Sequence, residues 1–221
     1  MNKLIHDLEQ ILPEGMGIPE PLKQLYNWIE ENNLSIKRSE ATIGLLYPFD
    51  KMKESWTDDG REGGTDIEFH ITGNESLKYW FGDGGNERKE ITSRLCVFAQ
   101  SGGDGSMCAL WKDDNGNTQI VHMGSGSGSI LCCVLADDAV DFLRLLAIGY
   151  DEICWDECFP YPPNHNTEFF VKPNIEFQNW VKETFNVTIP QTALEVVKHP
   201  AQIDDDESED AFFNWCKKNI I

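Results

Sequence analysis

The clearest pattern of hydrophobic and polar positions lies between residues 94 and 149. Three short runs rich in β-branched, aromatic and other apolar residues are separated by clusters of glycine, serine, aspartate and asparagine; the runs are 95–100, 107–111 and 119–123. Short runs with tight turn clusters between them are typical of antiparallel strands. We therefore predict a β-meander in this region.

The end of the same region changes to helical spacing. One apolar stripe, widened by neighbouring leucine and phenylalanine, contains Val140, Leu143 and Ala147. Asp137 or Asp138 is a suitable N-cap, and Gly149 can end the helix in a left-handed conformation. This spacing predicts a helix that packs on the meander.

Two amphipathic patterns precede the sheet region. Residues 3–12 follow a candidate cap at Asn2, and a second pattern begins near Pro19 and ends at residues 32–33. Between them and the meander, residues 43–47 and 66–71 predict strands.

The connections and the C-terminal part complete the pattern. A polar, glycine-containing loop at 56–64 joins the two predicted strands, and the local structure of 74–82 stays open. Helical spacing returns at 174–185 and briefly at 192–197. An acidic run at 204–210 precedes a hydrophobic segment that ends in lysines, which suits a docked terminal helix.

These patterns predict one α+β domain over residues 1–221. Its mostly antiparallel sheet, a meander, is flanked by N-terminal and C-terminal helices, and residues 199–221 form an acidic linker plus a C-terminal helix. With 221 residues, of which 40% are hydrophobic, the chain can bury a sizeable core.

Composition and cysteine usage indicate a cytoplasmic protein. The seven cysteines, an odd number, lack the short, even spacing of a disulfide framework; they stand at 96, 108, 132, 133, 154, 158 and 216. No run approaches the ~18 apolar residues of a membrane span, and the charged N-terminus does not resemble a signal peptide. We expect a soluble, cytoplasmic chain that does not bind membranes.

Charge narrows the choice of partner. The 38 acidic and 18 basic residues give a formal net charge of -20, which disfavours binding to nucleic acid or to anionic lipid. Acidity of this size either keeps the protein soluble or attracts a basic partner.

Candidate catalytic and metal motifs fail their templates. The glycine-serine run 124–129 lacks both the glycine spacing of a nucleophile elbow and the lysine of a phosphate loop, and the turn at 113–116 lacks the first ligand of a calcium loop. Cys154, Cys158 and His165 carry ligand atoms for zinc, but their spacing is long and a fourth ligand is missing. We therefore predict no metal, no cofactor and no enzymatic activity.

The chain resembles the SUKH superfamily, which includes bacterial immunity proteins and relatives that regulate yeast cell-wall assembly. The resemblance covers roughly residues 90–198 and rests on the meander strands, on the run Ile120-Val-His-Met-Gly-Ser-Gly-Ser-Gly and on the helix beginning Ala139-Val-Asp-Phe-Leu-Arg. It implies an α+β fold and a role in which the protein binds and neutralises a toxin, often a nuclease or deaminase, inside the producing cell.

A toxin that acts on nucleic acid usually carries a cationic surface, and a chain with a charge of -20 complements it. Acidic loops and tryptophans are therefore the predicted partner-binding residues: Trp56, Asp58, Asp59, Glu62, Asp66, Trp80, Asp83, Glu87, Asp113, Asp114 and Trp155. For any one of them, a solvated turn residue or a core tryptophan is the simpler interpretation.

Two other functions remain open at this point. One is a regulatory or scaffolding module that binds other proteins. The other is a hydrolase or transferase whose carboxylate pair is assembled from different loops, which would require a pocket with two facing acids.

Overall fold

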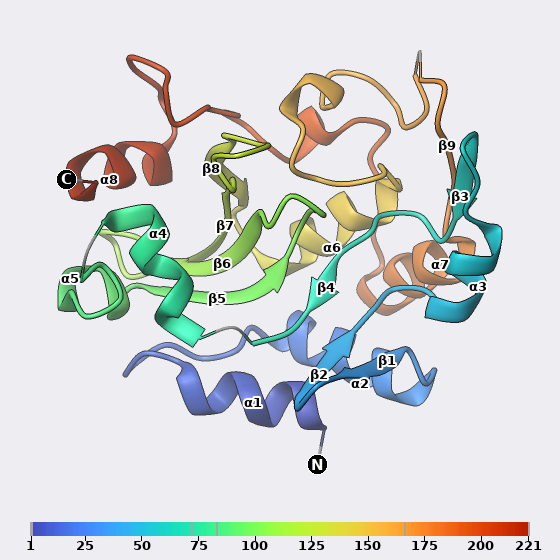
Figure 1. Cartoon of the computed structure of the whole chain (residues 1–221), viewed down its shortest axis with the longest axis horizontal. Helices are drawn as coiled ribbons and strands as arrows, with labels where there is room; N and C mark the ends of the chain where they lie inside the picture. Colours follow the sequence, from blue (N-terminus) through green and yellow to red (C-terminus); the bar gives the residue numbers. More distant parts are fainter. Residues whose placement is uncertain (1, 72, 83, 166, 221) are drawn as a thin grey trace.

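The main sheet is antiparallel throughout, as the sequence predicts. A computed structural model of the chain describes residues 2–71, 73–82, 84–165 and 167–220. The sheet runs in the order β1-β2-β4-β5-β6-β7-β8; its strands are β1 (Ser35–Arg38), β2 (Ala41–Gly44), β4 (Glu68–Phe69), β5 (Leu95–Gln100), β6 (Met107–Lys112), β7 (Thr118–Met123) and β8 (Cys132–Ala136). The predicted α+β class with a central meander is confirmed (Figure 1).

Helices cover both faces of this sheet. One face packs against the long helices α1 (Lys3–Ile11), α2 (Glu20–Glu31), α6 (Ala139–Ile148) and α7 (Ile175–Phe185). The other face packs against α4 (Leu77–Phe81), α5 (Lys89–Thr92) and α8 (Ala211–Asn219). Figure 1 shows α4, α5 and α8 grouped at one end of the molecule.

The sequence of the central strand β5 is a continuous apolar run because both faces of the strand are buried. Cys96 and Phe98 lie in the core under the long helices, whereas Leu95 and Val97 lie in the second core under α8. Alternate side chains point to opposite faces of a strand, so a strand covered on both faces needs no polar positions.

The predicted helices form where local capping signals are strong. Asn2 accepts hydrogen bonds from the amides of Leu4 and Ile5, and Asp138 caps α6 in the same way. Gly149 ends α6 with a φ of 94°. The terminal helix also docks, because Asp210 caps it and Phe212, Phe213 and Trp215 are buried.

Several elements differ from the prediction. Strand β8 follows the glycine-serine run, where no strand is predicted. The strand expected at 43–47 is shifted to 41–44, and the strand expected at 66–71 is limited to residues 68–69. The unsettled segment at 74–82 contains η1 (Gly73–Ser76) and α4. The short helix expected at 192–197 is the 3-10 turn η3 (Ala193–Glu195).

A second, parallel pair of strands lies beside the main sheet. β3 (Gly60–Glu62), inside the segment predicted as a loop, pairs with β9 (Phe170–Lys172), and α3 (Phe49–Ser55) packs beside β3. Gly60 has a φ of 154°, and a Cβ there would lie 2.1 Å from the carbonyl oxygen of Phe170. Glycine is therefore required for this close approach.

Among the described residues, no helix is long and apolar enough to cross a membrane.

Candidate functional site

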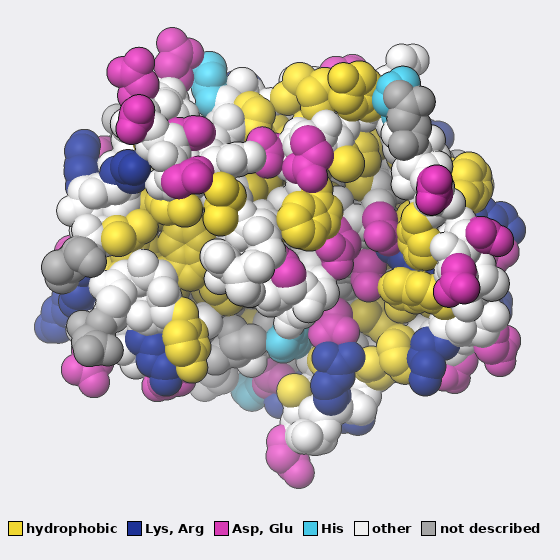
Figure 2. Space-filling model, turned by 45° about the horizontal axis from the view of Figure 1, so that its top comes forward, with side chains coloured by type: hydrophobic (Ala, Val, Ile, Leu, Met, Phe, Trp, Pro, Cys, Tyr) yellow, Lys and Arg dark blue, Asp and Glu magenta, His cyan; other side chains and the backbone are white. Residues whose placement is uncertain are grey.

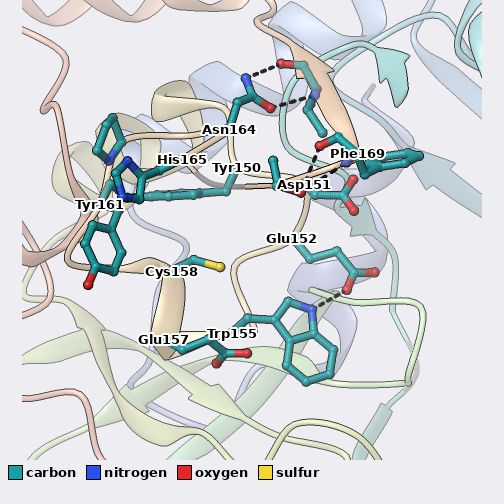
Figure 3. Close-up of a pocket in the computed structure, with 13 residues that line it drawn as sticks. Tyr150, Asp151, Glu152, Trp155, Glu157, Cys158, Tyr161, Asn164, His165 and Phe169 are labelled. Atoms are coloured by element: carbon teal, nitrogen blue, oxygen red, sulfur yellow. Dashed lines mark hydrogen bonds between the residues drawn. The ribbon is translucent and has the colours of Figure 1, made fainter. Parts of the chain in front are cut away.

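A concave feature lies within the connection from α6 to β9. It is a cavity of about 650 Å³, within the size range of ligand pockets. Its walls come mainly from residues 150–171, which include the 3-10 turn η2 (Asp156–Cys158). Figure 3 shows Asp151 and Trp155 on opposite sides of the opening, with the Cys158 thiol directed between them.

A buried arginine fixes one wall of the cavity. The Arg61 side chain is fully buried, and its Nε and Nη2 donate to Asp151 Oδ1 at 2.9 and 2.6 Å. Nη1 donates to the carbonyl of Gly64 at 2.8 Å, and Nη2 also donates to the carbonyl of Asp151. These bonds hold a residue of β3 against the segment that follows α6, although 90 positions separate them.

Glu152 fixes the opposite wall. Its Oε2 accepts a hydrogen bond from Trp155 Nε1 at 2.9 Å, and its Oε1 accepts one from the amide of Gly103 at 2.6 Å. The first bond orients the indole ring, and the second ties the wall to the loop between β5 and β6. Trp155 is therefore a fixed, half-buried wall and not a mobile surface ring.

Hydrogen bonds also shape the outer part of the cavity. Tyr150 donates its hydroxyl proton to the carbonyl of Tyr161 and accepts from the amide of Ala193. The Tyr161 ring stacks on His165 with centroids 4.5 Å apart. Asn164, with a φ of 65°, exchanges two hydrogen bonds with the backbone of Val171 and so joins this loop to β9.

Exposed aromatic rings lie near the cavity. Trp56 is 48% exposed and packs on Phe169, which lines the cavity, while Phe170 of β9 is 57% exposed. We call the surface around the cavity the acidic–aromatic face and define it by Trp56, Asp58, Asp59, Glu157, Tyr161, Phe169 and Phe170. Figure 2 shows hydrophobic side chains interspersed with carboxylates over the region of β3, β9 and residues 150–172.

Burial and hydrogen bonding shift the pKa values of groups near this face. Desolvation raises the pKa of the Asp66 carboxyl, although Arg61 lies near enough to oppose the shift. Desolvation and then the neighbouring Glu157 raise the pKa of the Cys158 thiol, which keeps it protonated at neutral pH. Glu62 shows the opposite behaviour, since hydrogen bonds from Lys172 and Tyr47 lower its pKa.

The structure brings six of the predicted binding residues to this region. Trp56, Asp58 and Asp59 are exposed beside β3. The backbone carbonyl of Asp59 accepts a hydrogen bond from the amide of Phe170. Trp155 lines the cavity. Glu62 and Asp66 are only half-exposed, and Glu62 is already paired with Lys172.

The other predicted residues lie elsewhere. Trp80 lines a smaller cavity beside α4, and Glu87 is an exposed residue of the turn before α5. Asp113 accepts hydrogen bonds from the amides of Asn115 and Asn117 in the β6–β7 turn, and Asp114 forms an ion pair with Arg94. Asp83 lies outside the described residues. The predicted set is therefore not one continuous surface.

The suggested zinc ligands do not form a metal site. Cys154 is buried and its thiol donates to Glu152, whereas Cys158 faces the cavity and His165 stacks on Tyr161. No group of three or more histidine, cysteine, aspartate or glutamate side chains in the described part of the chain could hold a metal ion.

Sequence reasoning missed most of the cavity wall. Asp151, Glu152, Glu157, Tyr161 and Phe169 were not singled out, although residues 150–161 alternate acids with aromatic rings. That alternation is the signal that could have identified all of them except Phe169, which lies beyond it. Arg61 gave no such signal, because its role depends on a partner 90 positions away.

Comparison of the chain with protein-family models, curated proteins and solved structures finds no match. The resemblance to the SUKH superfamily stays a prediction from the residues quoted above.

Proposed function

We propose that this chain is a non-enzymatic binding protein that neutralises a basic protein toxin, of the nuclease or deaminase type, in the bacterial cytoplasm. The observation that supports it best is the acidic–aromatic face. Exposed rings and carboxylates lie near one cavity, and no lysine or arginine is among the described residues that line it.

The chemistry of this face suits a protein partner. Trp56 and Phe170 keep large apolar areas in water, and tryptophan is among the residues most enriched at interface hot spots. Asp58 and Asp59 are exposed, and no ion pair with another described residue neutralises them. A cationic surface would cover the rings and neutralise the acids together.

Charge reversal with a matched control tests the location of the interface. The variant Asp58→Lys/Asp59→Lys changes the acidic–aromatic face, and Asp206→Lys/Glu207→Lys makes the same change in net charge on the exposed acidic run before α8. The tagged wild type first captures its partner from lysate at low and high salt, and mass spectrometry identifies it. Purified partner is then used for binding kinetics.

The first variant should lower the association rate constant about tenfold or more, whereas the control should lower it much less. The partner's activity on nucleic acid should also fall when wild-type chain is added. Equal rates for the two variants would place the interface elsewhere. A partner that stays fully active would favour the regulatory or scaffolding function instead.

A further inference from the structure

The cavity in the acidic–aromatic face combines two kinds of wall. Trp155, Tyr161 and Phe169 provide ring surfaces, and Asp151, Glu152 and Glu157 provide carboxylates. A cation held against ring faces gains cation–π attraction, and it forms charge-assisted hydrogen bonds with carboxylates. The walls therefore fit an organic cation better than a neutral or anionic group.

Two of these carboxylates retain oxygens that can accept from a ligand. Asp151 uses Oδ1 for both bonds from Arg61, and its Oδ2 accepts none from the described residues. Glu157 is exposed and forms no ion pair with another described residue. Glu152, by contrast, is already bonded to Trp155 and Gly103.

The arrangement distinguishes a guanidinium group from an ammonium group. A guanidinium is planar, stacks on aromatic rings, is weakly hydrated and presents several donors in one plane. A fixed indole beside separate carboxylates matches these properties, whereas a compact ammonium ion would lose more hydration and gain less stacking.

We propose that an arginine side chain of the basic partner enters this cavity, stacks on Trp155 and donates to Asp151 Oδ2 and Glu157. This inference rests on the proposed function, because it names the group with which that partner anchors itself. Arginine is also a frequent hot-spot residue at protein interfaces.

Small probes test the cavity without the partner. Nα-acetylarginine amide, the matching lysine amide and the uncharged citrulline amide are added to the full chain. Cys158 reports occupancy, because it is the exposed cysteine among seven and lines the cavity. A bound probe should slow its alkylation by a maleimide, measured by mass spectrometry.

The arginine amide should protect Cys158 with a Kd on the order of 1 mM, and the lysine amide should bind several-fold more weakly. The citrulline amide, which has the same shape without the charge, should not protect. Equal protection by citrulline, or none from arginine at concentrations on the order of 10 mM, would overturn the inference.

Substitutions in the cavity wall test whether the arginine amide binds at this site. By calorimetry, Trp155→Leu should weaken arginine binding roughly 2- to 30-fold and Glu157→Gln roughly two- to fivefold. Tyr79→Leu is the control, because Tyr79 is 81% exposed on α4, outside this cavity. Unchanged affinity in both cavity variants contradicts the proposed site.

The two proposals fail separately. If the arginine amide binds as described but no basic partner is captured, the cavity chemistry stands and the proposed function falls. If the captured partner is lost in Asp58→Lys/Asp59→Lys but keeps its affinity in Trp155→Leu and Glu157→Gln, the proposed function stands and the arginine anchor falls.

Discussion

Arg61 is the residue on which the cavity depends most directly. Its guanidinium is buried, yet the Asp151 side chain that it holds is 47% exposed. A buried cation is stable only when its donors are satisfied, and here three carbonyls, those of Glu62, Gly64 and Asp151, and one carboxylate oxygen satisfy them. Removing the guanidinium leaves the Gly64 carbonyl and Asp151 Oδ1 without that donor, whereas the Asp151 carbonyl keeps a hydrogen bond from the amide of Asp66.

We expect Arg61→Met to lower the free energy of unfolding by about 3 kcal/mol, because the acceptors that it leaves are buried or half-buried. Arg38→Met is the matched control, since Arg38 pairs with Glu68 at the surface and its loss should cost less than about 1 kcal/mol. Urea unfolding measures both. Similar losses in the two variants would show that burial of Arg61 contributes little.

His122 is a buried residue whose protonation opposes folding. Its Nδ1 lies 2.9 Å from the carbonyl of Leu131, which can only accept, so Nδ1 carries the proton and Nε2 accepts from the Ser101 hydroxyl. Desolvation lowers the pKa of His122 from 6.5 to about 4, although the hydrogen bond to the Leu131 carbonyl and the charges of Asp104 and Asp156 oppose the shift.

The unfolded chain therefore binds a proton at His122 more readily than the folded chain does. The neutral His122 side chain therefore favours the folded state fully above pH 6.5. As the pH falls from 6.5 toward 4, the free energy of unfolding falls by on the order of 3 kcal/mol in total. His122→Gln should remove this component. Urea unfolding from pH 7 to pH 4 tests it, and an equal pH slope in wild type and variant would contradict it.

At the scale of elements, the sequence predicts those helices and strands whose caps, apolar positions and turn residues lie close together in the chain. Helices α1, α6 and α7 carry a cap and an apolar stripe within about a dozen residues, so their existence follows from the sequence alone. Strands β5, β6 and β7 follow likewise from runs bounded by turn residues.

Strands β3 and β9 show where local reasoning fails. Each has three residues, and they pair in parallel across 110 positions, as in the register of Gly60 with Phe170. Nothing near Gly60 in the sequence indicates that partner. The acidic–aromatic face shares this property, because Trp56, Asp58 and Asp59 lie beside residues 150–171 only through the β3–β9 pairing and the bonds from Arg61 to Asp151. Sequence reasoning could therefore identify Trp56 and Trp155 individually but not the surface that they share.

Gly60→Ala tests how far the β3–β9 pair supports the site. The added Cβ would lie 2.1 Å from the Phe170 carbonyl oxygen, so the pair must separate, at a cost of roughly 1–3 kcal/mol plus backbone strain. Gly126→Ala is the control, because Gly126 also has positive φ, at 76°, but a Cβ there meets nothing within 4 Å.

Hydrogen exchange measured by mass spectrometry should show faster exchange in peptides around residues 59–64 and 168–173 of Gly60→Ala, with the β5–β8 meander unchanged. Gly126→Ala should leave both regions as in wild type. Exchange that rises equally throughout the chain would mean that the β3–β9 pair is not a separate unit of stability.

At the scale of the whole molecule, one charge distribution has opposite effects on folding and on binding. The net charge of -20 makes the folded chain repel itself, and the surface ion pairs that oppose this repulsion are individually weak. The same field attracts a basic partner to the acidic–aromatic face. Added salt screens both interactions.

We therefore expect NaCl to stabilise the free chain while weakening its complex. Raising the ionic strength from about 0.01 to 0.15 M shortens the Debye length from about 30 to 8 Å, so self-repulsion falls and Tm should rise, by about 2–4 °C for each kcal/mol gained. KCl should raise Tm as much as NaCl does, which separates charge screening from specific binding of one cation.

The affinity for the partner should fall over the same range of ionic strength. A Tm that falls with salt would mean that ion pairs outweigh repulsion in the folded chain, and an affinity that does not change would remove electrostatic attraction from the proposed interface.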